Sequence, residues 1–122
     1  MLTPEEERIK KYKRKLRKNL KETQDWLETH PKTPSQKELE GYDKPYQRTE
    51  VIVRRKKEYE QRKENKEDIL AALGRIANGT YGICIDSPKD SPHKIEKGRL
   101  NANPAYKRCC SCQANHFATE LK

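Results

Sequence analysis

Three of the four cysteines in this 122-residue chain are spaced as ligands of a structural zinc ion usually are. Such a site needs four soft ligands at tetrahedral positions, commonly supplied as two pairs whose members are separated by two residues. Cys109 and Cys112 form one such pair, and Cys84 begins a second. The residue three positions after Cys84 is Ser87, however, and a hydroxyl is a poor ligand for zinc. The segment from about Ala71 to Cys112 is therefore predicted to form a small zinc-binding module without its usual fourth ligand.

Several side chains near these cysteines are candidates for the fourth ligand. His93 lies in the same loop as Cys84, and its imidazole would complete a set of three cysteines and one histidine. We therefore predict one zinc ion per chain, held by Cys84, His93, Cys109 and Cys112. The alternatives are a module that packs without metal, or a different fourth ligand among Cys110, His116, Asp86 and Asp90.

The N-terminal part of the chain has the pattern of a long amphipathic helix. Thr3 can cap this helix, Pro4 suits its first position, and Glu6 completes a capping box. Lysine and arginine fill most other faces of the helix, while one stripe recurs every three or four residues: Ile9, Tyr12, Leu16, Leu20, Thr23 and Leu27. Pro31 and Pro34 then end the helix.

A second long helix is predicted from about Tyr46 to Asn78, where Gly79 supplies the stop. Its middle is polar around Arg62 and Lys66, and its stripe consists of Ile52, Tyr59, Ile69, Leu73 and Ile76. Prolines and glycine between residues 30 and 45 predict a loop with a short turn near residues 36–40. Two long helices joined by such a loop favour an antiparallel coiled-coil hairpin, whose seam the polar middle weakens.

Composition limits what this hairpin can bury and what it can bind. Hydrophobic residues make up 31% of the chain and charged residues 39%, so the core is small and needs help from a metal, a disulfide or a partner. The net charge of +9 favours a polyanionic partner: nucleic acid, an acidic protein channel or a membrane surface. The alternative is a solvated, lysine-rich helical surface without a partner.

The cellular compartment is inferred from two features that the sequence lacks, a membrane-spanning segment and a signal peptide. No run approaches the roughly 20 apolar residues that span a bilayer. The first residues are acidic and lack the apolar core of a signal peptide. We therefore expect a cytoplasmic protein, in which cysteines stay reduced and clusters of them bind metal more often than they form disulfides.

Two further stretches around the cysteines have a specific order. The run LGRIANGTYGIC occupies residues 73–84, and a second stretch carries Ile95, Arg99, Leu100, Ala102 and Pro104 before Cys109 and Cys112. These residues resemble the zinc-finger segment of the DksA/TraR family of transcription regulators, with its patterns L-x-R-I-x-x-G-T-Y-G-x-C and I-x-x-x-R-L-x-A-x-P followed by C-x-x-C. The resemblance covers about forty residues. It implies a mostly α fold: a helical hairpin over 1–79 with a tip loop near 30–45, and a zinc-finger-like module over 80–122.

The resemblance also implies a function. Members of this family bind RNA polymerase, and their coiled coil enters its secondary channel, where acidic tip residues alter initiation. The family's tip motif is D-x-x-D-x-A, and the nearest equivalent here is EGYDKP at residues 40–45, with Glu40 and Asp43 as its carboxylates. The family's second zinc cysteine is missing, because alignment places either Ser87 or Ser91 there.

In some family members the alarmone ppGpp strengthens the effect, and its phosphates need cationic side chains. Asn103 and Gln113 stand where the family pattern often carries cations, so we predict a weak ppGpp response or none.

Two other functions compete with this interpretation. A basic nucleic-acid-binding protein could use the cationic faces of residues 8–21 and 54–66. A zinc-binding adaptor could use the same scaffold for another protein partner. An enzyme is not expected, because the sequence has no glycine-rich phosphate loop, nucleophile elbow or paired-histidine metal motif.

Overall fold

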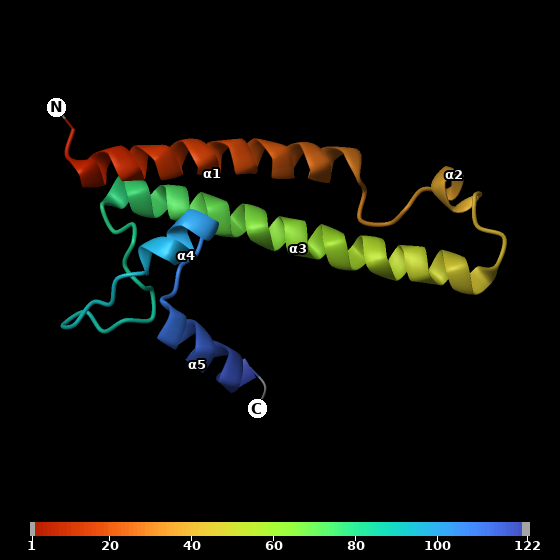
Figure 1. Ribbon diagram of the computed structural model, residues 1–122. Coiled ribbons are helices and arrows are strands. Elements are labelled where there is room, and N and C mark those ends of the chain that lie inside the picture. The colour runs from red at the N-terminus through yellow and green to blue at the C-terminus, as the bar shows by residue number, and fades with distance from the viewer. Residues whose placement is uncertain (1, 121–122) are drawn as a thin grey trace. The chain divides into compact units, whose positions relative to one another are not determined.

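The structure, a computed structural model, describes residues 2–120 and is mostly helical (Figure 1). The helices are α1 (Pro4–Thr29), α2 (Gln36–Leu39), α3 (Pro45–Asn78), α4 (Lys97–Ala102) and α5 (Cys110–Glu120). Within residues 2–120, β structure is limited to an isolated antiparallel bridge between Ile83 and Lys94. None of the described helices is both long enough and apolar enough to cross a membrane. The helical hairpin of α1 and α3 and the small C-terminal module with clustered cysteines confirm the predicted fold class.

The start of α1 and the end of α3 coincide with their local sequence signals. The backbone N–H of Glu6 donates to Oγ1 of Thr3 at 3.1 Å, as expected of a capping box. At the end of α3, the N–H of Thr80 donates to the carbonyl of Arg75 at 2.9 Å, and Gly79 adopts a φ of 76°. Glycine reaches this left-handed conformation without strain, so α3 stops where the sequence predicts.

The chain forms two compact units, and each combines segments that are distant in the sequence. The base unit comprises Met1–Asn19 and Asp68–Lys122, and the tip unit comprises Leu20–Glu67. The division that the sequence suggests, into a hairpin over 1–79 and a module over 80–122, stays a prediction.

The core of the base unit joins α1, α3 and residues 80–112, here called the knuckle. Tyr12 of α1 is 4% exposed, and its hydroxyl donates to Oδ1 of Asn101 in α4. Its ring centroid lies 5.9 Å from that of Tyr81 in the knuckle. The buried apolar residues described in this unit include Tyr12, Leu16, Ile69, Ala72, Cys84, Ile95, Leu100, Pro104, Ala105 and Cys109. Two of the predicted zinc ligands are therefore part of the same core that holds the helix ends.

In the tip unit, a cationic side chain of α3 packs where the apolar stripe is interrupted. The guanidinium of Arg62 lies 4.9 Å from the centroid of the Trp26 ring, which also stacks on His30 at 4.4 Å. Arg55 donates to the carbonyl of Pro31, 3.4 Å away, and pairs with Glu38. The polar middle of α3 thus packs through a cation–π contact and an ion pair.

The tip loop, residues 30–45, contains α2, which matches the short turn predicted near residues 36–40. Oγ of Ser35 accepts the N–H of Glu38 at 3.2 Å and caps this short helix. Arg48 donates from Nε to the carbonyl of Tyr42 at 2.8 Å, which ties the end of the loop to α3. Since α3 begins at Pro45, one residue before its predicted start, proline occupies the first helical position, where its missing N–H has no cost.

Candidate metal centre

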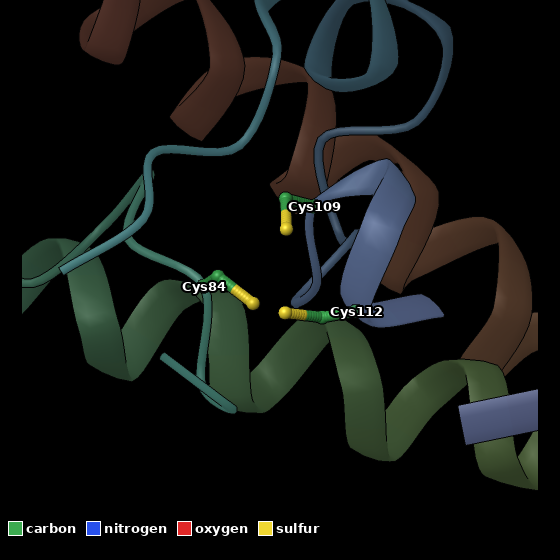
Figure 2. Close-up of side chains that lie close together, drawn as sticks. All are labelled: Cys84, Cys109 and Cys112. Carbon is green, nitrogen blue, oxygen red and sulfur yellow. The ribbon is translucent and has the colours of Figure 1, made fainter. Parts of the chain in front are cut away.

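Three sulfur atoms converge in the knuckle (Figure 2). Cys84 follows α3, Cys109 directly precedes α5, and Cys112 lies in the first turn of α5. The Sγ atoms of these residues all lie within 4.8 Å of one another. Thiolates bound to one tetrahedral zinc ion lie about 3.8 Å apart, because each Zn–S bond is about 2.3 Å long. The cluster therefore has the donor type and nearly the spacing that zinc requires.

Backbone hydrogen bonds fix the position of Cys84. Its N–H donates to the carbonyl of His93 at 2.8 Å, and the N–H of Ile95 donates to the carbonyl of Gly82 at 2.8 Å. These bonds close the loop between residues 84 and 93. The N–H of Ile85 donates to the carbonyl of Lys107 at 2.9 Å, which joins the loop to the segment that leads to the other two cysteines.

Glu96 positions α5, a role that its sequence context does not reveal. Both carboxylate oxygens of Glu96 accept the N–H of Cys110 at 3.2 Å and so satisfy a donor at the start of the helix. Hydrogen bonds from its own N–H and from that of Cys110 lower the pKa of the Glu96 carboxyl. Because Glu96 is 14 residues away in the chain, no local capping pattern predicts this contact.

The predicted fourth ligand, His93, lies beside the sulfur cluster. Its Nδ1 is 3.7 Å from Sγ of Cys112, although the group of mutually close ligand atoms contains only cysteines among the described residues. The imidazole therefore contacts Cys112 at the edge of the cluster and does not lie close to all three sulfurs.

The other fourth-ligand candidates differ in their surroundings. Asp86 pairs with Arg108 through an Oδ2–Nε contact of 2.6 Å. Ser87 donates its hydroxyl to the carbonyl of Cys84 at 2.7 Å. Cys110 is exposed and lies outside the cluster. His116 lines a cavity of about 330 Å³ together with Cys112.

The pKa values of two thiols in the cluster, Cys84 and Cys112, are shifted in opposite directions. Burial raises the pKa of Cys84, but hydrogen bonds from the backbone of Cys109 and Asp86 and from the two neighbouring thiols outweigh it and lower this pKa. Hydrogen bonds to Cys109 and Cys84 raise the pKa of Cys112 to about 12. One thiolate is thus stabilised by the S–H groups of its neighbours. A divalent cation would replace those protons, so the donor chemistry fits zinc.

The predicted tip carboxylates, Glu40 and Asp43, are exposed in the tip loop. The C-terminal end of α2 carries Glu40, and Asp43 lies shortly before α3. Over residues 2–120 neither side chain has a hydrogen bond or ion pair, in contrast to Glu38, whose pKa is lowered by a hydrogen bond from Arg55. Within the tip loop, the Glu38 carboxylate therefore stabilises the fold, whereas those of Glu40 and Asp43 do not.

Comparison with known proteins supports the fold. No model of a known protein family matches the sequence, and no curated protein matches it. The structure of transcription factor DksA2 from Pseudomonas aeruginosa is similar, with a TM-score of 0.68 and 22% sequence identity. The similarity covers 96% of this chain and 88% of the DksA2 chain. The chain therefore has a DksA-like fold along nearly its whole length.

Proposed function

We propose that this chain, with its DksA-like fold, is a transcription regulator that binds RNA polymerase through the secondary channel and modulates initiation. The observation that carries the proposal is the fold similarity to a transcription factor over 96% of the chain. The similarity includes the hairpin as well as the knuckle, so the proposal does not depend on the cysteines alone. It assigns the chain a binding role and no catalytic residue.

The tip unit supplies the part that would enter the channel. It contains 12 lysines and arginines and 11 acidic residues, so its formal charge is only +1. Its loop presents Glu40 and Asp43 without partners of their own. Carboxylates exposed in this way can approach a metal ion or a cationic group of the polymerase active centre, because no ion pair within the described chain neutralises their charge.

The base unit would hold one structural zinc ion through Cys84, His93, Cys109 and Cys112. Zinc in such a site crosslinks the chain and contributes folding free energy without chemistry of its own. In this chain it would join the loop after α3 to the start of α5. The role of the ion is therefore to stabilise the fold of the base unit.

The proposal includes a weak response to ppGpp or none. Oδ1 of Asn103 accepts the N–H of Ala105 at 3.0 Å, so this side chain stabilises a turn and carries no charge. Gln113, in α5, is also neutral. Neither position offers the cationic side chain that gripping a phosphate requires.

The proposal predicts a one-to-one complex between the full-length protein and bacterial core RNA polymerase, measurable by native mass spectrometry. An unrelated basic protein of equal size and net charge is the control, because a charge of +9 by itself attracts acidic surfaces. A complex formed by this chain and not by the control supports the proposal. Absence of any complex at micromolar concentrations and low salt, with the helical content intact, would contradict it.

A further inference from the structure

The positive charge of this chain belongs almost entirely to the base unit. Segments Met1–Asn19 and Asp68–Lys122 contain 16 lysines and arginines and 8 acidic residues, a formal charge of +8. The tip unit carries only +1 of the total of +9. A hairpin whose tip acts inside a polymerase does not require this distribution, so the base needs a separate explanation.

The charge is most concentrated in the second to fourth turns of α1, directly after the acidic first turn of Glu5, Glu6 and Glu7. Eight of the eleven residues from 8 to 18 are lysine or arginine, and none is acidic. The remaining three are Ile9, Tyr12 and Leu16, of which Tyr12 and Leu16 are buried in the core. At 3.6 residues per turn, Lys10, Arg14 and Arg17 align on the opposite side of the helix, and all three are exposed. We call these three side chains the α1 basic face.

No ion pair in the described part of the chain neutralises these cations. Over residues 2–120, no ion pair involves residues 8–18, and Lys15 is the one cation of this segment whose side chain donates a hydrogen bond, to the carbonyl of Asn101 at 3.1 Å. Like charges three or four residues apart repel one another along the helix. In the tip unit, by contrast, cations of α3 have partners: Arg55 pairs with Glu38 and Arg62 with Glu58.

A second group of cations lies on the other side of α1. Arg8 lines a cavity of about 440 Å³ together with Lys94 of the knuckle and Lys97 of α4; Tyr12 and the acidic Glu5 also line it. The base unit therefore carries lysine and arginine on both sides of α1. Such a distribution fits a ligand with repeated negative charges better than one with a single anion.

We propose that the α1 basic face binds the phosphate backbone of nucleic acid without reading its sequence. Interfaces between proteins are rich in aromatic anchors and poor in lysine at their centre. The basic face has no aromatic anchor, since it consists of Lys10, Arg14 and Arg17. Phosphates are contacted by such long cationic side chains, and release of counterions drives the binding. This contact is independent of polymerase binding.

The test is a titration of a short fluorescent DNA duplex with the full-length protein at several salt concentrations. The logarithm of the association constant is expected to fall with the logarithm of salt concentration, with a slope of about −3 or steeper. In the variant Lys10→Gln/Arg14→Gln/Arg17→Gln, the magnitude of this slope should fall by about 2 to 3. DNA binding at low salt should weaken on the order of 10²-fold. Its melting temperature should not fall, because the substitutions remove repulsion within α1.

The matched control removes the same charge from the tip unit, through Lys56→Gln/Lys57→Gln/Lys63→Gln. These side chains are exposed on α3 among acidic residues, so their removal should change DNA affinity by less than about threefold. Equal losses in both variants would mean that net charge alone attracts DNA and would overturn the proposal. It would also be overturned if the protein failed to bind DNA at low salt, or bound polyglutamate as tightly as DNA, since an acidic protein surface would then be the better partner.

Discussion

Replacing Cys84 with serine is expected to abolish zinc binding and to destabilise the base unit. The side chain of Cys84 is 2% exposed and packs in one cluster with Tyr12, Ile95 and Leu100, so the substitution removes a ligand and places a hydroxyl in the core. Structural zinc contributes about 10–16 kcal/mol of apparent binding free energy in zinc-finger peptides. We expect the zinc content to fall from one per chain to less than about 0.1, and the free energy of unfolding to fall by more than about 3 kcal/mol. Metal analysis and urea denaturation measure the two effects.

Two companion variants identify the ligand set. Cys110→Ser should retain the full zinc content and stability, because this thiol is exposed and lies outside the cluster. His93→Ala should weaken zinc binding by tenfold or more, since three thiolates would remain without the imidazole. Unchanged zinc content in Cys84→Ser would refute the proposed site, and unchanged affinity in His93→Ala would exclude histidine as the fourth ligand.

Replacing Asp43 with asparagine is expected to separate binding from activity. The carboxylate is exposed and has no partner within the described chain, so its loss should leave the stability of the protein unchanged. Polymerase affinity should change by less than about twofold, because most of the interface would lie elsewhere on the hairpin and base. The effect on initiation should fall about tenfold, which corresponds to about 1.4 kcal/mol of lost electrostatic interaction. In vitro transcription from a responsive promoter measures it, and Glu40→Gln should act in the same direction.

The matched control is Asp90→Asn, which neutralises an exposed carboxylate in the knuckle. It should leave both binding and transcription unchanged. If Asp43→Asn and the control behave alike in the transcription assay, the tip carboxylates have no specific role. A loss of polymerase binding in Asp43→Asn would instead make this residue part of the docking surface.

Local signals in the sequence predict the helical hairpin well. The contact between Thr3 and Glu6, the stop at Gly79 and the short helix inside the tip loop all depend on residues a few positions apart. Cap and turn preferences act over the same distances, so they are visible without the fold. The three clustered cysteines were also predictable, because pairs of soft ligands at this spacing are restricted to few structures.

Contacts between distant segments could not be predicted from the sequence in this way. Glu96 satisfies the start of α5, and Arg62 packs on Trp26, yet no spacing rule connects either pair. These polar contacts also hold distant segments together where the small core offers little apolar area for packing. The sequence shows that His93 shares a loop with Cys84, but only the fold brings it beside Cys112, since the bridge between Ile83 and Lys94 closes that loop. The role of His93 as a zinc ligand stays a prediction.

Site-specific photo-crosslinking from the tip loop to RNA polymerase tests directly whether the tip enters the secondary channel. Tyr42 lies between the two tip carboxylates and is 38% exposed, so a photoreactive phenylalanine analogue can replace it with little disturbance. Phe117 of α5, 55% exposed in the base unit, is the comparison site. If the tip enters the secondary channel, the probe at Tyr42 crosslinks to segments lining the channel near the active centre, while the probe at Phe117 does not. Crosslinks from Tyr42 only to the outer surface of polymerase, or none in a formed complex, would rule out secondary-channel binding.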